Sequence, residues 1–248
     1  MKVRALVVLL VALAACSCAP RPAPKPPGPR RFACRRALGP ITLDGRITET
    51  AWDRAQPIGD FTVPGTGQRA KQATTVRFLW DDQFLYLAVT MTDDDVYAIK
   101  TTHDSATWED DVCELFLKPS DVESPYYEIH VTPRGTTLDL LIGRRGAAGT
   151  FERWTSWESG IEAKVRVIGT LNDWRDKDQG WVVEAAIPLK ALGAANPKPQ
   201  LGDRWLFALC RYNYSVYLPE GRELSSSARL AEENFHRYED FDYLEFSE

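Results

Sequence analysis

The stretch "TTVRFLWDDQFLYLAVTMT", residues 74–92, decides the fold class. Apolar residues occupy every second position from Leu85 to Met91, and a β-strand places alternate side chains on the same face. The polar residues 81–83 interrupt the apolar pattern in the middle, as a tight turn does. Residues 74–92 therefore predict a β-hairpin of two strands, each with one buried face.

Similar strand-like runs follow along the chain, and helical periodicity is almost absent. The further predicted strands are 111–118, 126–133, 136–142, 161–169, 180–188, 203–215 and 240–246. Short helical segments are predicted at 48–55, which would bury Trp52, and at 189–192. We expect an all-β fold, a single β-sandwich of about nine to eleven mainly antiparallel strands with one or two short helices.

The N-terminus predicts export and a lipid anchor. Residues 1–15 have a basic start and an apolar core too short to span a bilayer, as in a signal peptide. The segment "LAAC" resembles a bacterial lipobox, which implies cleavage before Cys16 and acylation of that cysteine, and Ser17 resembles the outer-membrane sorting pattern. A plain secretory signal is the alternative. Residues 16–32 are rich in proline and predict an extended tether of roughly 40 Å, at about 3.1 Å per residue.

Charge is divided unevenly between the tether and the rest of the chain. Of 30 Lys and Arg residues, eight lie in residues 1–36, which contain no acid, so residues 37–248 hold 22 bases against 35 acids. A domain this acidic is not expected to bind nucleic acid, which requires a basic surface. The basic tether could instead lie against anionic lipid headgroups of the membrane.

The cysteines leave disulfide pairing open. Exported proteins can form disulfides, but the pairing of Cys18, Cys34, Cys113 and Cys210 cannot be deduced from their positions. Cys113 and Cys210 fall within predicted strands, where an isolated cysteine is more often a small core residue.

A set of six segments in a fixed order resembles the carbohydrate-binding module family 9-like proteins. The segments are "ITLDGRITETAWDRA", "FLWDDQFLYLAVTMTDDDV", "WEDDVCELFLKP", "YYEIHVTPRGTTLDLLI", "GTLNDWRDKDQGWVVEAAIPLKAL" and "NFHRYEDFDYLEF". The resemblance covers about residues 33–248 and implies one β-sandwich domain. The founding members are sugar-binding modules of xylanases that hold glycan ends between two aromatic rings. The resemblance thus implies non-catalytic binding of a glycan or oligosaccharide by a protein of the bacterial envelope.

The same resemblance implies a set of site residues. Trp108 matches a stacking tryptophan and Glu114 a ligand-bonding glutamate within "WEDDVCE", while Asn234 and Phe235 match the C-terminal half of the site. An indole packs against the C–H face of a sugar ring, and carboxylates accept hydrogen bonds from its hydroxyls. We predict that Trp108 stacks, that Phe235 closes the site, and that Glu114, Glu128 and Asn234 bind hydroxyls. The chain departs from the family pattern at Tyr238 and Asp242, where Pro and Gly are usual.

Two other functions remain open from the sequence. The fold could present a surface to another envelope protein, which would require an exposed apolar patch. Glu114 and Glu128 could also act as a hydrolytic carboxylate pair, which requires a separation of about 5 Å or about 6.5–9.5 Å. No nucleophile elbow or phosphate-binding loop is present.

Metal ions and haem are two further ligand classes to consider from the sequence. The founding modules of the family hold structural calcium, and carboxylates that could supply its ligands are those of Asp93, Asp94, Asp95, Asp110 and Asp111. No EF-hand spacing is present, and the three histidines, His103, His130 and His236, share no metal-ligand spacing. Haem would need an axial ligand such as Met91, which we expect instead to be a core residue.

Overall fold

The computed structural model describes residues 28–123, 125–146, 151–193 and 198–248. The predicted signal peptide, Cys16, Cys18 and most of the tether lie outside these ranges. Within them, no helix has the length and apolar character needed to cross a membrane.

The all-β expectation is confirmed, with eleven strands in the described ranges. The strands are β1 (Arg31–Arg36), β2 (Thr74–Trp80), β3 (Phe84–Thr92), β4 (Val112–Lys118), β5 (Tyr126–Val131), β6 (Thr137–Ile142), β7 (Glu162–Ile168), β8 (Gly180–Pro188), β9 (Arg204–Tyr214), β10 (Arg222–Ser226) and β11 (Asp242–Ser247). The helical elements are the 3₁₀ turns η1 (Thr50–Arg54), η2 (Thr107–Glu109), η3 (Leu189–Ala191) and η4 (Tyr238–Asp240), and one short α-helix, α1 (Phe151–Trp154). The predicted hairpin is present as β2 and β3.

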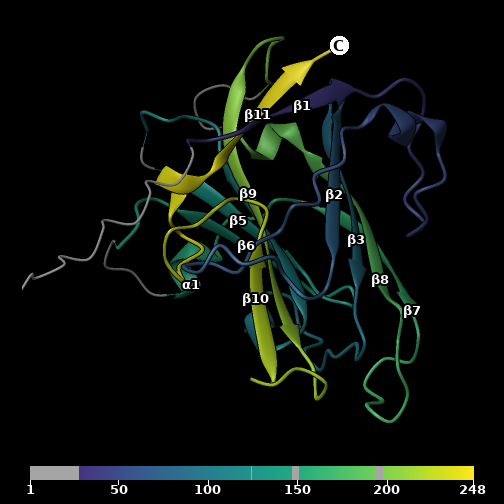
Figure 1. Ribbon diagram of the computed structural model, residues 1–248. Coiled ribbons are helices and arrows are strands. Elements are labelled where there is room, and N and C mark those ends of the chain that lie inside the picture. Colours follow the sequence, from purple (N-terminus) through teal and green to yellow (C-terminus); the bar gives the residue numbers. More distant parts are fainter. Residues whose placement is uncertain (1–27, 124, 147–150, 194–197) are drawn as a thin grey trace, which may run out of the picture.

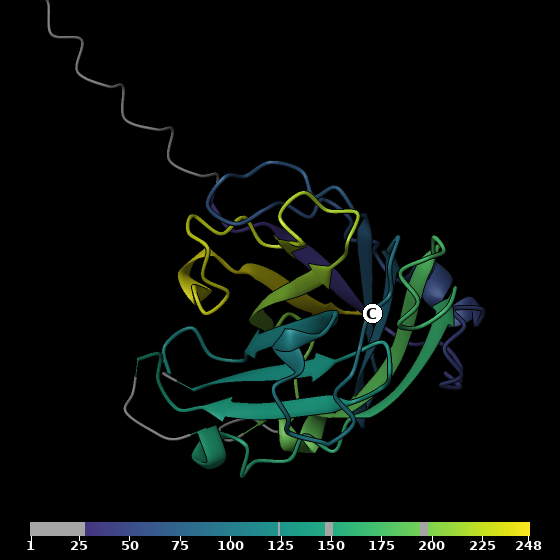
Figure 2. The ribbon, with the colours of Figure 1, turned by 90° about the horizontal axis from the view of Figure 1, so that it is seen from below.

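The strands are hydrogen-bonded in the order β6-β5-β4-β9-β11-β1-β2-β3-β8-β7, and β10 also pairs with β9. Pairing is antiparallel except where β1 lies parallel to β11 and to β2. The sheet curls so that its two halves face one another (Figure 1). In Figure 2, the teal strands β4–β6 form one wall, and the blue and green strands β2, β3, β8 and β7 form another.

The main core lies between the two walls. Phe78 of β2 meets Phe207 of β9 edge to face, with ring centroids 5.2 Å apart, so side chains from opposite halves of the sheet interdigitate. Met91 and Cys113 lie in this core, and Cys210 lies in a second one. Cys34, Cys113 and Cys210 are all buried free thiols, which confirms the core assignment of the two strand cysteines.

Strands β4 and β5 are buried on both faces, because a second apolar cluster covers the outer face of their wall. This cluster contains Phe116 of β4, Leu140 of β6 and Cys210 of β9, together with Phe235 and Phe241 from the segment before β11. The returning C-terminal segment therefore covers this face, and the candidate site lies between the two.

Strand β1 begins at Arg31, within the segment predicted as tether, and pairs with β11. Arg30 precedes it and forms an ion pair of 2.7 Å with Asp242, whose side chain is 3% exposed. Asp242 also accepts a hydrogen bond from the Arg30 backbone N–H at 2.8 Å. Asp242, one of the departures from the family pattern, thus attaches the start of the domain to its last strand.

Candidate functional site

A hollow of about 390 Å³ opens on the outer face of the β4–β5–β6 wall, beside the C-terminal segment. Its lining residues are Trp108, Glu114, Phe116, Glu128, His130, Leu140, Ile142, Phe151, Trp154, Tyr212, Leu224, Glu233, Asn234, Phe235 and His236. All five residues predicted to bind carbohydrate are among them. The fold brings them together from η2, two strands and the segment before η4.

Trp108 is the exposed aromatic residue of this hollow. It lies in the turn η2, directly before β4, and 36% of its surface is exposed. Its ring meets Phe151 edge to face, with centroids 5.6 Å apart, and its backbone carbonyl accepts a hydrogen bond from the Tyr214 hydroxyl at 2.8 Å. These two contacts hold the residue in place and leave part of the indole accessible to a ligand.

The acids that follow Trp108 support the turn rather than face a ligand. Asp110 is buried and accepts hydrogen bonds from the backbone N–H groups of Ile99 and Lys100 at 2.9 and 2.7 Å. Asp111 is also buried and accepts one from the backbone N–H of Tyr214 at 2.6 Å. These bonds join the loop before η2 and the end of β9 to the start of β4, and so position Trp108.

The other acids predicted as calcium ligands have protein partners as well. Asp93 forms a buried ion pair with Arg211 at 2.8 Å, and Asp95 accepts a hydrogen bond from the backbone N–H of Val216 at 2.9 Å. Asp94 lies 3.4 Å from the ammonium of Lys177. None of the five acids belongs to either cluster of three close ligand groups in the described part of the chain.

The floor of the hollow is a buried group of two carboxylates and an imidazole. His130 Nε2 lies 2.8 Å from Glu128 Oε1 and 3.6 Å from Glu114 Oε1, and its Nδ1 lies 2.8 Å from the Thr107 hydroxyl. Glu114 stands opposite His130 in the β4–β5 register, and Glu128 is two residues before His130 on β5, so all three side chains share one face. All three residues are at most 5% exposed.

Burial and neighbouring charges shift the pKa values of Glu114 and His130. Burial raises the pKa of Glu114 because it disfavours the charged carboxylate. The neighbouring His130 lowers this pKa and the Glu128 carboxylate raises it, and the resulting pKa of Glu114 is about 8. Burial lowers the pKa of His130, but the carboxylates of Glu114 and Glu128 raise it by more, so that the net pKa is raised. The group therefore holds a proton near neutral pH and can offer a ligand both hydrogen-bond donors and acceptors.

One acceptor of the floor has no hydrogen-bond donor among the described residues. Glu128 Oε2 is buried and accepts no hydrogen bond from any described residue, and His236 Nδ1 lies 3.7 Å from it. A buried carboxylate oxygen without a donor is costly, and such atoms are usually satisfied by water or a ligand. A ligand hydroxyl in the hollow would provide this donor.

The C-terminal half of the site is less open than the prediction implied. Phe235 lines the hollow but is only 6% exposed, and its ring meets Tyr212 edge to face at 5.3 Å. It therefore forms part of the wall and not a free platform. Asn234 is exposed at the rim, where its Oδ1 accepts a hydrogen bond from the backbone N–H of His236 at 3.0 Å.

Tyr238, the other departure from the family pattern, stabilises this wall. Its ring meets that of Tyr126 edge to face at 5.6 Å, and the Arg145 guanidinium lies 4.7 Å from its centroid. Tyr126 in turn is within hydrogen-bond distance of His236, with its hydroxyl 3.0 Å from Nδ1. Tyr238 thus packs behind the segment that carries Asn234 and Phe235.

Several lining residues were not predicted as site residues. Tyr212 and His130 could have been found from strand alternation, because they share a face with Glu114 and Glu128 once the strands are paired. No sequence pattern indicated Phe151 and Trp154. Both lie on α1, a single helical turn, and only tertiary contacts bring this turn to Trp108. His236 was considered in the sequence only among the three histidines that share no metal-ligand spacing.

The sequence and the fold are similar to those of known proteins. Residues 43–210 match the model of the "Carbohydrate family 9 binding domain-like" family. A candidate carbohydrate-binding protein from Bacteroides uniformis superposes with a TM-score of 0.68 at 15% identity, covering 88% of this chain and 100% of the other. A family 9 carbohydrate-binding module from Caldicellulosiruptor kristjanssonii, solved with cellotriose, gives a TM-score of 0.57 at 15% identity and covers 88% of this chain and 94% of the other.

The same Caldicellulosiruptor module solved with glucose gives a TM-score of 0.55 at 15% identity, covering 88% of this chain and 95% of the other. No curated protein matches this sequence. The structural likenesses show the shared fold, and the family match extends over more than half of the chain. The chain therefore belongs to the carbohydrate family 9 binding domain-like family.

Proposed function

We propose that this protein is a non-catalytic carbohydrate-binding lipoprotein that holds a glycan in the hollow beside Trp108. One observation carries the proposal: a partly exposed indole stands beside a buried floor in which Glu128 Oε2 has no donor from the described part of the chain. Sugar rings present this combination of chemistry, with C–H groups on one face and hydroxyls at the edge. The related module bound to cellotriose and glucose supports the same ligand class.

Each predicted residue has a role in this proposal. Trp108 stacks on the sugar ring, and Glu114 and Glu128 bond hydroxyls from the floor. Asn234 contacts the ligand from the rim, and Phe235 supplies apolar contact from the wall. A hydroxyl that donates to Glu128 Oε2 would satisfy a buried floor oxygen that has no donor among the described residues.

The carboxylate geometry favours binding over hydrolysis. Oxygens of Glu114 and Glu128 lie within 4.8 Å of one another, below the roughly 6.5–9.5 Å that an inverting pair needs. Both also contact the same His130 Nε2 from one face of the sheet. A retaining pair must flank the scissile bond, whereas these two groups are buried side by side against the same imidazole.

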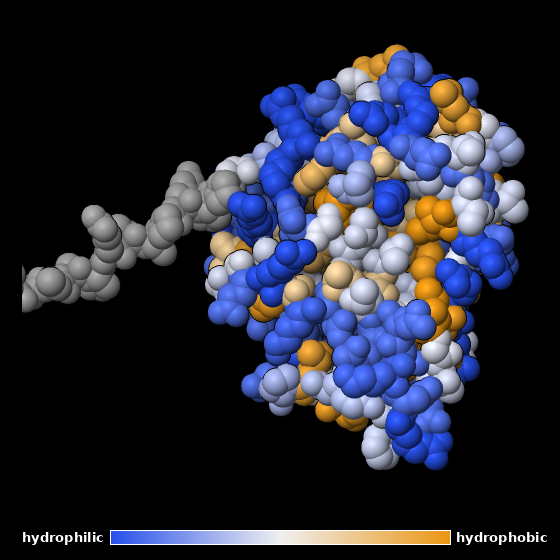
Figure 3. Space-filling view, turned by 45° about the vertical axis from the view of Figure 1, so that its right-hand side comes forward, coloured by the Kyte–Doolittle hydropathy of each residue, from blue (hydrophilic) through white to orange (hydrophobic). Residues whose placement is uncertain are grey.

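An envelope protein as partner is the second candidate, and the surface seen in Figure 3 does not favour it. On that face hydrophilic side chains predominate, and the hydrophobic ones form small groups and one narrow strip along the right-hand side. Protein-binding surfaces usually present a broader apolar patch. The hollow beside Trp108, in contrast, combines apolar walls with a charged floor.

Tryptophan fluorescence and calorimetry with a panel of mono- and oligosaccharides test the binding proposal. Saturable binding should be weakened by about 1–3 kcal/mol in Trp108→Ala, because an aromatic anchor in a binding site contributes on this scale. The melting temperature should change little. Trp174→Ala is a matched control, since Trp174 is 61% exposed and does not line this hollow.

Two results would refute the proposal. Equal affinity of Trp108→Ala and the unaltered protein would remove Trp108 from the site. Absence of a saturable response across a broad panel, combined with capture of an envelope protein that Trp108→Ala does not affect, would favour the protein-partner alternative.

The anchor is a separate part of the proposal, supported by the lipobox-like segment before Cys16 and by the basic tether. We expect a diacylated or triacylated Cys16 and recovery of the protein in the outer-membrane fraction of the cell envelope. Mass spectrometry of the mature N-terminus and fractionation of Cys16→Ala check this. Membrane recovery of Cys16→Ala equal to that of the unaltered protein would contradict lipid anchoring.

A further inference from the structure

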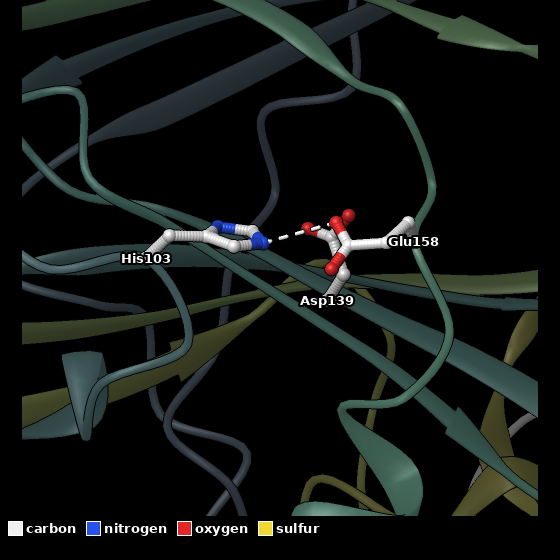
Figure 4. A group of neighbouring side chains, drawn as sticks. All are labelled: His103, Asp139 and Glu158. Atoms are coloured by element: carbon white, nitrogen blue, oxygen red, sulfur yellow. Dashed lines mark hydrogen bonds and ion pairs between the residues drawn. The ribbon is translucent and has the colours of Figure 1, made fainter.

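A second group of ligating side chains lies on the opposite face of β6 from the hollow. Leu140 and Ile142 face the hollow, so Asp139 points to the other side of the strand. There it meets His103, from the loop before η2, and Glu158, from the loop after α1 (Figure 4). These three segments lie far apart in sequence.

The three groups converge closely. His103 Nε2 lies 3.1 Å from Glu158 Oε2, and one ligand atom from each of His103, Asp139 and Glu158 lies within 4.8 Å of the other two. Asp104 Oδ1 adds a further carboxylate 3.4 Å from His103 Nε2. The imidazole is therefore surrounded by negative charge on its Nε2 side.

Contacts on the other side of the ring hold His103 in this orientation. Its Nδ1 lies 3.1 Å from the Thr137 carbonyl oxygen and 2.9 Å from the Thr137 hydroxyl. A backbone carbonyl can only accept, so this contact favours a proton on Nδ1. Glu158 Oε2 likewise can only accept, so an ion bound between Nε2 and the carboxylates would take the place of the Nε2 proton. Metal-binding histidines are oriented in this way by a hydrogen bond to their second nitrogen.

The hydrogen bonding of Asp139 is a second, independent observation that points to a ligand in this cluster. The residue is 1% exposed, and its Oδ2 accepts hydrogen bonds from the backbone N–H of Ser159, at 2.8 Å, and from the Ser159 hydroxyl. Its Oδ1 is buried and has no hydrogen-bond partner among the described residues. A buried carboxylate oxygen in this state is destabilising unless a donor or a cation satisfies it.

We propose that His103 Nε2, Asp139 Oδ1 and Glu158 Oε2 bind a divalent transition-metal ion of the Zn²⁺ class, with a water in the fourth position. The edge of a tetrahedron with metal–ligand bonds of about 2.0–2.1 Å is about 3.3 Å, close to the observed spacing of His103 and Glu158. An imidazole ligand favours Zn²⁺, Ni²⁺ or Cu²⁺ over Ca²⁺ and Mg²⁺, which take oxygen ligands.

Metal binding here would link two parts of the molecule that flank the glycan hollow. Glu158 follows α1, which carries Phe151 and Trp154 of the hollow, and Asp139 belongs to β6. The ion would tie the segment after α1 to the sheet and stabilise the folded state by mass action. The site itself does not depend on carbohydrate binding.

Calorimetric titration of the metal-free, full-length protein with ZnCl₂ near neutral pH tests the proposal. We expect one equivalent of Zn²⁺ to bind and the melting temperature to rise with it. His103→Ala and Asp139→Asn should each weaken this binding by about 100-fold, since the first removes a direct ligand and the second replaces a charged ligand with a neutral amide. In His236→Ala, which removes the half-buried imidazole near Glu128, the affinity should be unchanged.

A Co²⁺ titration supplies a spectroscopic readout, because visible bands of tetrahedral Co²⁺ should appear with the unaltered protein and be absent in His103→Ala. If Asp139→Asn fails to fold, Glu158→Gln serves in its place, since the Glu158 side chain is 65% exposed. Unchanged Zn²⁺ affinity in His103→Ala, or no Zn²⁺ binding at all, would overturn the proposal. Loss of binding in Glu128→Gln with retention in Glu158→Gln would also overturn it, by placing the ion in the hollow.

Discussion

The buried group beneath Trp108 should make the protein less stable as pH rises. The folded-state pKa of Glu114 is about 8, against an ordinary value of 4.5, so between these values the folded protein holds a proton that the unfolded chain has lost. Stability is then greatest below the unfolded pKa and falls as pH rises through the folded one. The raised pKa of His130 acts in the same direction.

The size of this effect follows from the shift. At about 1.36 kcal/mol per pH unit, moving the pKa of Glu114 from 4.5 to about 8 corresponds to about 5 kcal/mol if Glu114 titrated alone. Glu114 shares its proton with His130 and Glu128, and such coupled groups titrate together, so a smaller share belongs to Glu114 itself. We expect about 2–4 kcal/mol to depend on this carboxyl.

Urea unfolding at a series of pH values between about 5 and 9 measures this term. Glu114→Gln keeps the shape of the side chain but cannot lose a proton. The unfolding free energy of the unaltered protein should therefore fall between pH 5 and 9 by about 2–4 kcal/mol more than that of the Glu114→Gln variant. Glu232→Gln, with a side chain that is 66% exposed, is the control and should follow the unaltered protein. Parallel curves for Glu114→Gln and the unaltered protein would refute this account of the floor.

Three further substitutions test other contacts by urea unfolding. Asp93→Ala should lower the unfolding free energy by about 3–5 kcal/mol, because it removes the ion-pair partner of the buried Arg211. The double variant Asp93→Asn, Arg211→Met should lose less stability, because no buried charge of the pair remains. Equal losses in the two variants would contradict this account. Arg30→Met should lower the unfolding free energy by about 1–3 kcal/mol, because the buried Asp242 loses its ion pair. A loss no larger than that caused by substituting an exposed surface residue would show that β1 does not need this contact. Phe235→Ala should cost about 3–5 kcal/mol from loss of a buried ring, and a smaller cost would mean that the wall closes around the gap.

Local pattern was sufficient for most of the strands. The hairpin of β2 and β3 was predicted with the bounds that the structure shows, because alternation of apolar residues is a property of neighbouring positions. Strands β1 and β10 were not predicted. Both are short and largely polar, "RFACRR" and "RELSS", and they are strands because β11 and β9 pair with them, which no local pattern encodes.

The sequence by itself determined the fold class, the family resemblance and the identities of Trp108 and Glu114 as site candidates, because these depend on local motifs. Only the tertiary structure decided how these residues combine. The curled sheet and the returning C-terminal segment place Asn234 and Phe235 beside Trp108, and strand pairing places His130 between Glu114 and Glu128. The burial that raises the pKa of Glu114 is likewise a consequence of packing. Proximity and desolvation arise between segments distant in sequence, so they cannot be read from either segment alone.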